Sequence, residues 1–134
     1  MSLTVDEVRA VFAGLQTGGG RAFFNHVADD VDWTVQGTHP LAGHYRGKAA
    51  FLAGTFAKLA RVLRDDAQLS VVNVMVSGDW AIVELRADAT AKNGMRFDNS
   101  YCWLARFHDG KIVEVRAYLD SALVARLFAE NPRT

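Results

Sequence analysis

Apolar residues recur at helical spacing through the first half of the chain. Thr4, followed three residues later by Glu7, forms a capping box that predicts the start of a helix. The apolar face of this helix is made by Val8, Val11, Phe12 and Leu15. The glycine run at residues 18–20 ends it, and a second short helix is expected to carry Phe23, Phe24 and Val27. Residues 48–63 are expected to form one long helix, because the same spacing links Leu52, Phe56, Leu59 and Leu63.

Turn sequences divide the second half into strands. Asn-Gly at residues 93–94 and Asp-Gly at residues 109–110 favour hairpins because these residue types tolerate positive φ, and Ser-Gly-Asp at residues 77–79 marks another turn. They predict four consecutive antiparallel strands near residues 68–77, 80–90, 95–108 and 111–119. An earlier strand is expected at residues 31–36, and Asp120 is expected to cap a last helix. The order favours a single α+β domain over residues 1–134, with the helices packed on one face of the sheet.

Side chains alternate across a strand, so their parity assigns them to the two faces of the sheet. The inner, apolar face of the third sheet strand is expected to carry Asn99, Tyr101 and Trp103 in a row among hydrophobic residues. Either each of these polar groups bonds to backbone or water, or the three line a cavity for a small molecule. Trp33 alternates with Val31 and Val35, so it is expected to face inward as a cavity wall.

The opposite face of the sheet mixes charges with aromatic residues. Parity places on it Trp80, Ile82, Glu84, Arg86, Arg106, Ile112, Glu114, Arg116 and Tyr118. Exposed Trp and Tyr are enriched at interfaces, so we expect a homodimer through this outer face. The alternative is an ordinary solvated sheet face.

Charge and composition narrow the classes of function. Lys plus Arg and Asp plus Glu both number 15, so no basic stripe points to nucleic acid or to an anionic membrane surface. The apolar runs are too short to span a bilayer. The single cysteine, Cys102, cannot form an intramolecular disulfide, which favours a cytoplasmic location. The four histidines are scattered without metal-ligand spacing, so no zinc site is expected. No other cofactor is expected either.

Several stretches of the chain resemble the SnoaL-like branch of the nuclear transport factor 2-like superfamily. They are ADDVDWTVQG, LAGHYRGKAAF and FDNSYCWLARFHDGKIVEVRAYLDSALVARLF, and together they cover most of the sequence. The resemblance implies a curved antiparallel sheet wrapped by helices into a cone, with a ligand cavity at its open end. It also implies dimers through the outer face of the sheet. Relatives include polyketide cyclases, ketosteroid isomerases and limonene epoxide hydrolases.

The residues that carry those relatives' chemistry are missing here. Ketosteroid isomerases use a carboxylate base with a tyrosine and a protonated aspartic acid, and the corresponding positions lie near Val11, Val35 and Trp103. The carboxylate that epoxide hydrolases carry on the last strand falls near Ala117. No acidic residue of the kind that the cyclases use lies on the inferred inner face.

Two hypotheses about function therefore stay open. In the first, the chain is a cofactor-free isomerase, cyclase or lyase, with His39 moving a proton while Tyr101 and Asn99 polarise an oxygen of a small apolar carbonyl compound. The alternative for His39 is a loop histidine exposed to solvent. In the second, it binds a small hydrophobic ligand without chemistry. In both, Tyr45 is expected either to close the mouth of the cavity or simply to cap the loop before the long helix. A third, weaker possibility is a dimerisation scaffold whose cone is only packed core.

Overall fold

The computed structural model describes residues 3–17 and 20–132, and its centre is one six-stranded sheet. The strands follow the spatial order β2-β1-β6-β5-β4-β3. Their bounds are β1 (Val27–Val35), β2 (Gly43–Arg46), β3 (Leu69–Ser77), β4 (Trp80–Ala87), β5 (Ser100–His108) and β6 (Lys111–Leu119). The helices are α1 (Val5–Phe12), α2 (Arg21–Phe24), α3 (Lys48–Gly54), α4 (Phe56–Val62) and α5 (Ser121–Glu130), with a short 3-10 turn at Ala13–Leu15.

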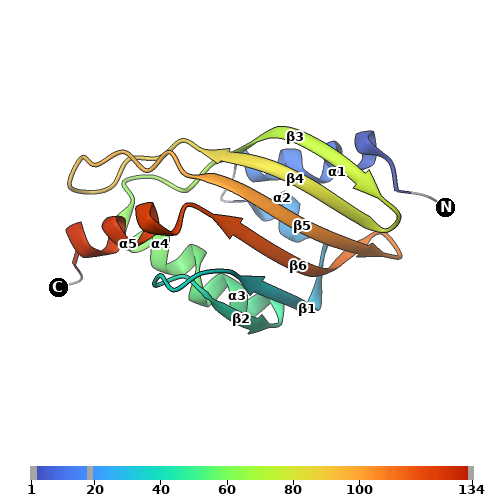
Figure 1. Cartoon of the computed structure of the whole chain (residues 1–134), viewed down its shortest axis with the longest axis horizontal. Helices are drawn as coiled ribbons and strands as arrows, with labels where there is room; N and C mark the ends of the chain where they lie inside the picture. The colour runs from blue at the N-terminus through green and yellow to red at the C-terminus, as the bar shows by residue number, and fades with distance from the viewer. Residues whose placement is uncertain (1–2, 18–19, 133–134) are drawn as a thin grey trace.

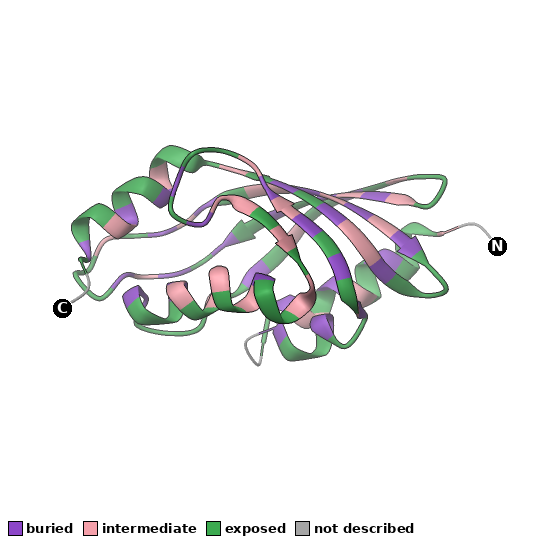
Figure 2. Cartoon of the chain, turned by 90° about the horizontal axis from the view of Figure 1, so that it is seen from below, coloured by how far each residue is buried: buried purple, intermediate pink, exposed green. Residues whose placement is uncertain are grey.

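The first four helices lie on one side of the sheet (Figures 1 and 2). Helix α1 packs against β3, and α3 packs against β1 and β2. Within residues 3–17 and 20–132, no helix lies over the strands on the face turned to the viewer in Figure 1. This arrangement confirms the α+β class, with a curved sheet covered by helices on its inner face. No helix in residues 3–17 and 20–132 has the length and apolar character needed to cross a membrane.

Strand parity identifies the inner face of the sheet correctly over most of its length. The inward residues of β4 and β5 are buried, as shown by exposed fractions of 0% for Val83, 4% for Trp103 and 0% for Ala105. They pack with α1, α2 and α3 in the main core. A second core cluster joins α4, α5 and the segment after β4 through Leu59, Val62, Leu63, Ala91, Phe97, Val124 and Leu127.

Ile112 is the exception to this parity, and its expected place on the outer face is wrong. Ile112 is fully buried, because a β-bulge in β6 changes the register. Arg106 pairs with Glu114 whereas Phe107 pairs with Ile112, so Val113 is an extra residue and parity reverses beyond it. Nothing in the apolar pattern marks the bulge. The sheet also contains one parallel pair, β1 with β6, beside the expected antiparallel strands.

The expected helix at residues 48–63 is interrupted. Thr55 adopts φ −129° and ψ −79°, which separates α3 from α4. Its hydroxyl donates to the Phe51 carbonyl at 2.7 Å, a local bond that competes with regular helix geometry. Apolar periodicity survives the break, so the sequence pattern does not reveal it.

Other boundaries shift as well. The loop expected after the first strand contains β2, Val27 begins β1 instead of lying on α2, and residues 95–99 precede β5. The first helix ends at Phe12 and runs into the 3-10 turn. Gly18 and Gly19, predicted to end it, lie outside the described residues.

Candidate functional site

A small apolar cavity lies between the inner face of the sheet and the broken helix. Its volume is about 40 Å³. The floor comes from β1, β5 and β6, and α3 and α4 cover it with Phe51, Thr55, Phe56 and Leu59. The remaining lining residues are Trp33, Val35, Leu41, Ala67, Leu69, Tyr101, Trp103, Ala117 and Leu119. A cavity of this size can hold a water-sized group. It is smaller than an engineered cavity of about 150 Å³ that binds benzene.

Aromatic rings form one wall of this cavity. Trp33 stacks on Phe51 with ring centroids 3.8 Å apart and planes 20° apart. Trp103 meets Trp33 edge to face at 5.2 Å, and Tyr101 meets Trp103 at 6.1 Å. The structure thus brings together three of the predicted ligand-binding residues. The covering phenylalanines, Phe51 and Phe56, were not predicted as site residues, because their helical spacing also suits ordinary core packing.

Two polar atoms of the wall residues have no hydrogen-bond partner in the part of the chain that the structure describes. The indole Nε1 atoms of Trp33 and Trp103 are buried, and neither has a hydrogen-bond acceptor within the described part of the chain. An unsatisfied buried donor costs about 1–3 kcal/mol, so both atoms represent a local cost to the fold. Each such group calls for a specific explanation, and an acceptor supplied by a ligand is one.

Tyr101 adds a hydroxyl to the same wall. Burial alone raises the pKa of this phenol well above its ordinary value of 10.0. The hydroxyl therefore stays protonated around neutral pH and remains a donor. None of the described residues lining the cavity is acidic, basic or a histidine, so Tyr101 is its one titratable group within that set.

Asn99 and Tyr45 bond to the backbone and do not line the cavity. The Asn99 side chain is fully buried and closes a pair of hydrogen bonds with Asp120, donating to its carbonyl at 3.2 Å and accepting from its amide at 3.0 Å. Asp120 in turn caps α5 through the Leu123 amide. The Tyr45 hydroxyl donates to the Leu41 carbonyl at 2.9 Å. Both residues therefore shape the elements around the cavity.

His39 is buried in the loop after β1, with both ring nitrogens occupied. Nδ1 accepts from the Leu41 amide at 3.2 Å, and Nε2 lies 2.9 Å from the Gln36 carbonyl, to which it donates in the matching tautomer. Leu41 lines the cavity but His39 does not. Proton transfer through His39 would have to break one of these loop bonds, so the geometry favours a structural role. The catalytic role stays a prediction.

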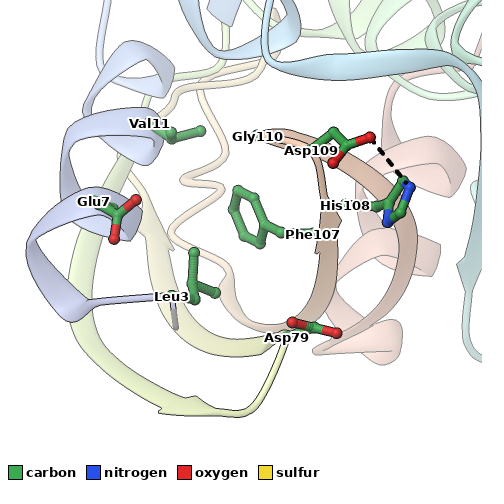
Figure 3. Close-up of a pocket in the computed structure, with 8 residues that line it drawn as sticks. All are labelled: Leu3, Glu7, Val11, Asp79, Phe107, His108, Asp109 and Gly110. Atoms are coloured by element: carbon green, nitrogen blue, oxygen red, sulfur yellow. Dashed lines mark ion pairs between the residues drawn. The ribbon is translucent and has the colours of Figure 1, made fainter. Parts of the chain in front are cut away.

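A larger depression lies beyond α1, at the tips of the β3–β4 and β5–β6 hairpins (Figure 3). Its volume is about 520 Å³, and its lining includes Leu3, Glu7, Val11, Asp79, Phe107, His108, Asp109 and Gly110. Figure 3 shows Phe107 at its centre and the acidic groups spread around the rim. His108 and Asp109 pair at 3.3 Å with side chains 71% and 89% exposed. The described residues include no cluster of three or more groups suited to a metal ion. The depression has an acidic rim of exposed side chains, and the apolar cavity lined by aromatic residues is the stronger candidate.

Residues 8–115 match the model of the SnoaL-like domain. The chain belongs to the SnoaL-like domain family. The core strands, the helices over them and the cavity between them all fall largely within the matched range.

Known relatives of this SnoaL-like domain include two fungal proteins. It is 30% identical over 112 residues to the dimerizing cyclase phiC of a fungal species, covering 81% of this chain and 50% of that protein. It is 27% identical over 114 residues to the dimerizing cyclase tstC of Talaromyces stipitatus, covering 82% and 51%. The chain therefore spans about half the length of these curated relatives. An NTF2-like protein from Burkholderia thailandensis shares the fold, with a TM-score of 0.74 at 24% identity over 92% of this chain and 95% of that one.

Proposed function

We propose that this SnoaL-like domain binds a small, mostly apolar molecule in the cavity walled by Trp33, Tyr101 and Trp103. The observation that carries the proposal is an apolar cavity lined by aromatic rings, two of which have buried indole N–H groups with no acceptor among the described residues. Ligand sites are typically apolar walls with a few directed polar groups, and this cavity has that composition. A core packed for stability alone is expected to satisfy or avoid such donors.

A cyclase-type reaction is the second candidate, and the observation that favours it is the similarity to two proteins named dimerizing cyclases. In such a role, the Tyr101 hydroxyl would polarise an oxygen of the substrate as that oxygen gains electron density. His39 would have to act from outside the cavity after giving up a loop bond. The absence of charged groups among the described lining residues favours binding or reactions guided by shape over proton abstraction.

We also propose a homodimer through the outer face of the sheet. Met75 and Tyr118 are 51% and 44% exposed there, and none of the described helices covers the strands on this side (Figure 1). Arg116 lies over the ring of Trp80 at 5.3 Å, which adds a cation–π contact to the same face. A cytoplasmic location stays a prediction that rests on the single cysteine.

Thermal unfolding with a panel of small ring compounds tests the binding proposal. Ala67 is half-buried at the cavity, so Ala67→Leu should fill space there, whereas Ala57→Leu changes an exposed position of α4. Compounds that raise the melting temperature of the wild type and of Ala57→Leu should have little effect on Ala67→Leu. Equal stabilisation of all three proteins would place the binding site elsewhere.

A further inference from the structure

The open depression beyond α1 has the shape and the charge of a second binding site (Figure 3). We propose that it binds a small organic ammonium ion that carries an apolar ring or chain. The apolar part would lie on the floor of the depression, and the ammonium group would face the carboxylates of its rim. The depression and the inner cavity share no lining residue in the described part of the chain, so this site is independent of the proposed function.

Elements that are distant in the sequence enclose the depression on several sides. Helix α1 supplies Glu7 and Val11, the β3–β4 turn supplies Asp79, and the β5–β6 hairpin supplies Asp109 (Figure 3). The enclosed volume of about 520 Å³ falls within the range of about 300–1,000 Å³ that is usual for small-molecule sites. The depression therefore has space for a complete small ligand.

The floor of the depression is apolar. Phe107 lies at its centre, with Leu3 and Val11 beside it (Figure 3). Leu3 and Val11 are only half-buried, so apolar surface there is still in contact with water. An aromatic or alkyl group placed against these side chains would remove apolar surface from water, which favours its binding.

The rim of the depression is negatively charged. Glu7, Asp79 and Asp109 are exposed, and no Lys or Arg within residues 3–17 and 20–132 forms an ion pair with any of them. Glu7 accepts a hydrogen bond from the Thr4 amide, and Asp109 lies 3.3 Å from the imidazole of His108. Three carboxylates around one concave surface create a negative potential, which attracts a cation and repels an anion.

These features together favour an organic ammonium ion over other cations. A bare metal ion lacks its ligands, because the described residues include no group of three or more side chains suited to bind one. An ammonium ion on an apolar body needs no such close ligand shell, since attraction between charges extends over about 10 Å at an ionic strength of about 0.1 M. The enclosed outline suits a compact molecule better than an extended peptide.

A nuclear magnetic resonance titration with three probes of similar size tests the proposal. The probes are 2-phenylethylammonium, the neutral 2-phenylethanol and the anion 3-phenylpropanoate. The ammonium ion should shift the Val11 methyl and Phe107 ring resonances in a saturable way. It should bind at least about tenfold more tightly than 2-phenylethanol, and 3-phenylpropanoate should not bind. Added sodium chloride should weaken binding of the ammonium ion and leave that of the alcohol unchanged.

A variant of the rim locates the attraction. Glu7→Gln, Asp79→Asn and Asp109→Asn, combined in one protein, remove three charges with little change in shape. Glutamine also serves in a capping box, and asparagine tolerates the φ of 50° at residue 109, so the fold should be retained. This variant should bind 2-phenylethylammonium about tenfold more weakly than the wild type does, while its affinity for 2-phenylethanol stays within about twofold.

A matched control removes the same number of charges elsewhere. Asp65→Asn, Asp66→Asn and Glu130→Gln change exposed carboxylates outside the depression. Their combination should leave the affinity for 2-phenylethylammonium within about threefold of the wild type, because salt screens charges at a distance. Ala67→Leu, which fills the inner cavity, should not change this affinity.

Several results would overturn the ammonium site. They are equal affinities for the ammonium ion and the alcohol, equal losses in the rim variant and the control variant, and shifts confined to the lining of the inner cavity. If small ring compounds bind the inner cavity but 2-phenylethylammonium does not bind the depression, the proposed function stands and this inference fails. Binding of N-acetyl-phenylalanyl-lysine amide more than about tenfold tighter than that of 2-phenylethylammonium would show a peptide site instead of a small-molecule site.

Discussion

Trp33 on β1 and Trp103 on β5 meet edge to face across β6, with ring centroids 5.2 Å apart and planes at 83°. Trp103 pairs with Ala117 of the intervening strand, and Ala117 also lines the cavity. Because alanine is small, the two indoles can approach above it. Their N–H groups have no acceptor in residues 3–17 and 20–132. The two rings are therefore closely packed although each contains an unpaired hydrogen-bond donor.

The first prediction concerns the cost in stability of the unpaired Trp103 indole N–H group. Trp103→Phe should change the free energy of unfolding by less than about 1 kcal/mol, because the loss of packing is offset by removal of an unpaired donor worth about 1–3 kcal/mol. Phe97→Leu, at a fully buried position of the second core cluster, is the control and should cost about 1–2 kcal/mol. Urea unfolding measures both. A loss above about 3 kcal/mol in Trp103→Phe would show that its N–H is satisfied in the folded protein.

Burial of the Tyr101 phenol predicts that the stabilities of the wild type and of Tyr101→Phe depend differently on alkaline pH. Burial raises the pKa of its phenol above 10.0, so the folded state holds this proton more tightly than the unfolded state does. The stabilising contribution is therefore complete below pH 10 and falls as the pH rises above it, by at most about 1.4 kcal/mol per pH unit. Tyr101→Phe should be less sensitive than the wild type above pH 10. Identical pH profiles for the two proteins would refute the burial of the phenol.

The close approach of Gly54 to Tyr45 predicts a packing conflict next to the helix break when residue 54 is enlarged. A methyl group at Gly54 would overlap the Tyr45 ring, so Gly54→Ala should destabilise the protein by about 1–3 kcal/mol although alanine favours helix. The cost should largely disappear in a Tyr45→Ala background. A double-mutant cycle measured by chemical unfolding gives the coupling energy, and additivity of the two changes would contradict the close contact.

The hydrogen bonds of His39 predict that removing its side chain lowers stability more than it lowers ligand affinity. His39→Ala removes the acceptor of the Leu41 amide and should cost about 1–3 kcal/mol. Ligand affinity, measured well below the melting temperature, should change little. Turnover of carbonyl and epoxide substrates by wild type and His39→Ala tests the catalytic hypothesis in parallel. Activity that depends on His39, with folding intact, would restore it as the acid or base.

If the homodimer forms through the outer face, one charged residue placed in that face should disrupt it. Ile82 is half-buried there and pairs with Met75 on one side and Leu104 on the other. Ile82→Asp should convert a wild-type dimer into a monomer, whereas Ala125→Asp on exposed α5 should not. Light scattering after size-exclusion chromatography measures the mass. A monomeric wild type at high protein concentration would remove the dimer proposal.

The sequence predicts this fold well where one local rule decides the outcome. The Thr4–Glu7 capping box forms as expected, and β6 has the predicted bounds of residues 111–119. The prediction from the sequence fails where a local irregularity of the backbone leaves the apolar pattern unchanged. The bulge at Val113 exchanges the face of Ile112, and the turn at Thr55 divides a helix whose periodicity continues through it.

The site shows the same division between local pattern and spatial arrangement. Parity places Trp33, Tyr101 and Trp103 on the inner face, and these three meet at the cavity. Parity says nothing about partners, so it could not show that Asn99 is bound by Asp120 while the two indoles are left unpaired. Those partners depend on how β5 meets the start of α5, which is a tertiary relationship.

The central claim is that the ligand lies against Trp33 and Trp103. Intermolecular nuclear Overhauser effects between protein protons and a bound compound from the panel of small ring compounds measure this most directly. The account predicts contacts from the probe to the indole protons of Trp33 and Trp103 and to the Ala117 methyl group, with none to Trp80. Contacts to Phe107 in the open depression, or to Trp80 on the outer face, in place of those to Trp33 and Trp103 would contradict it.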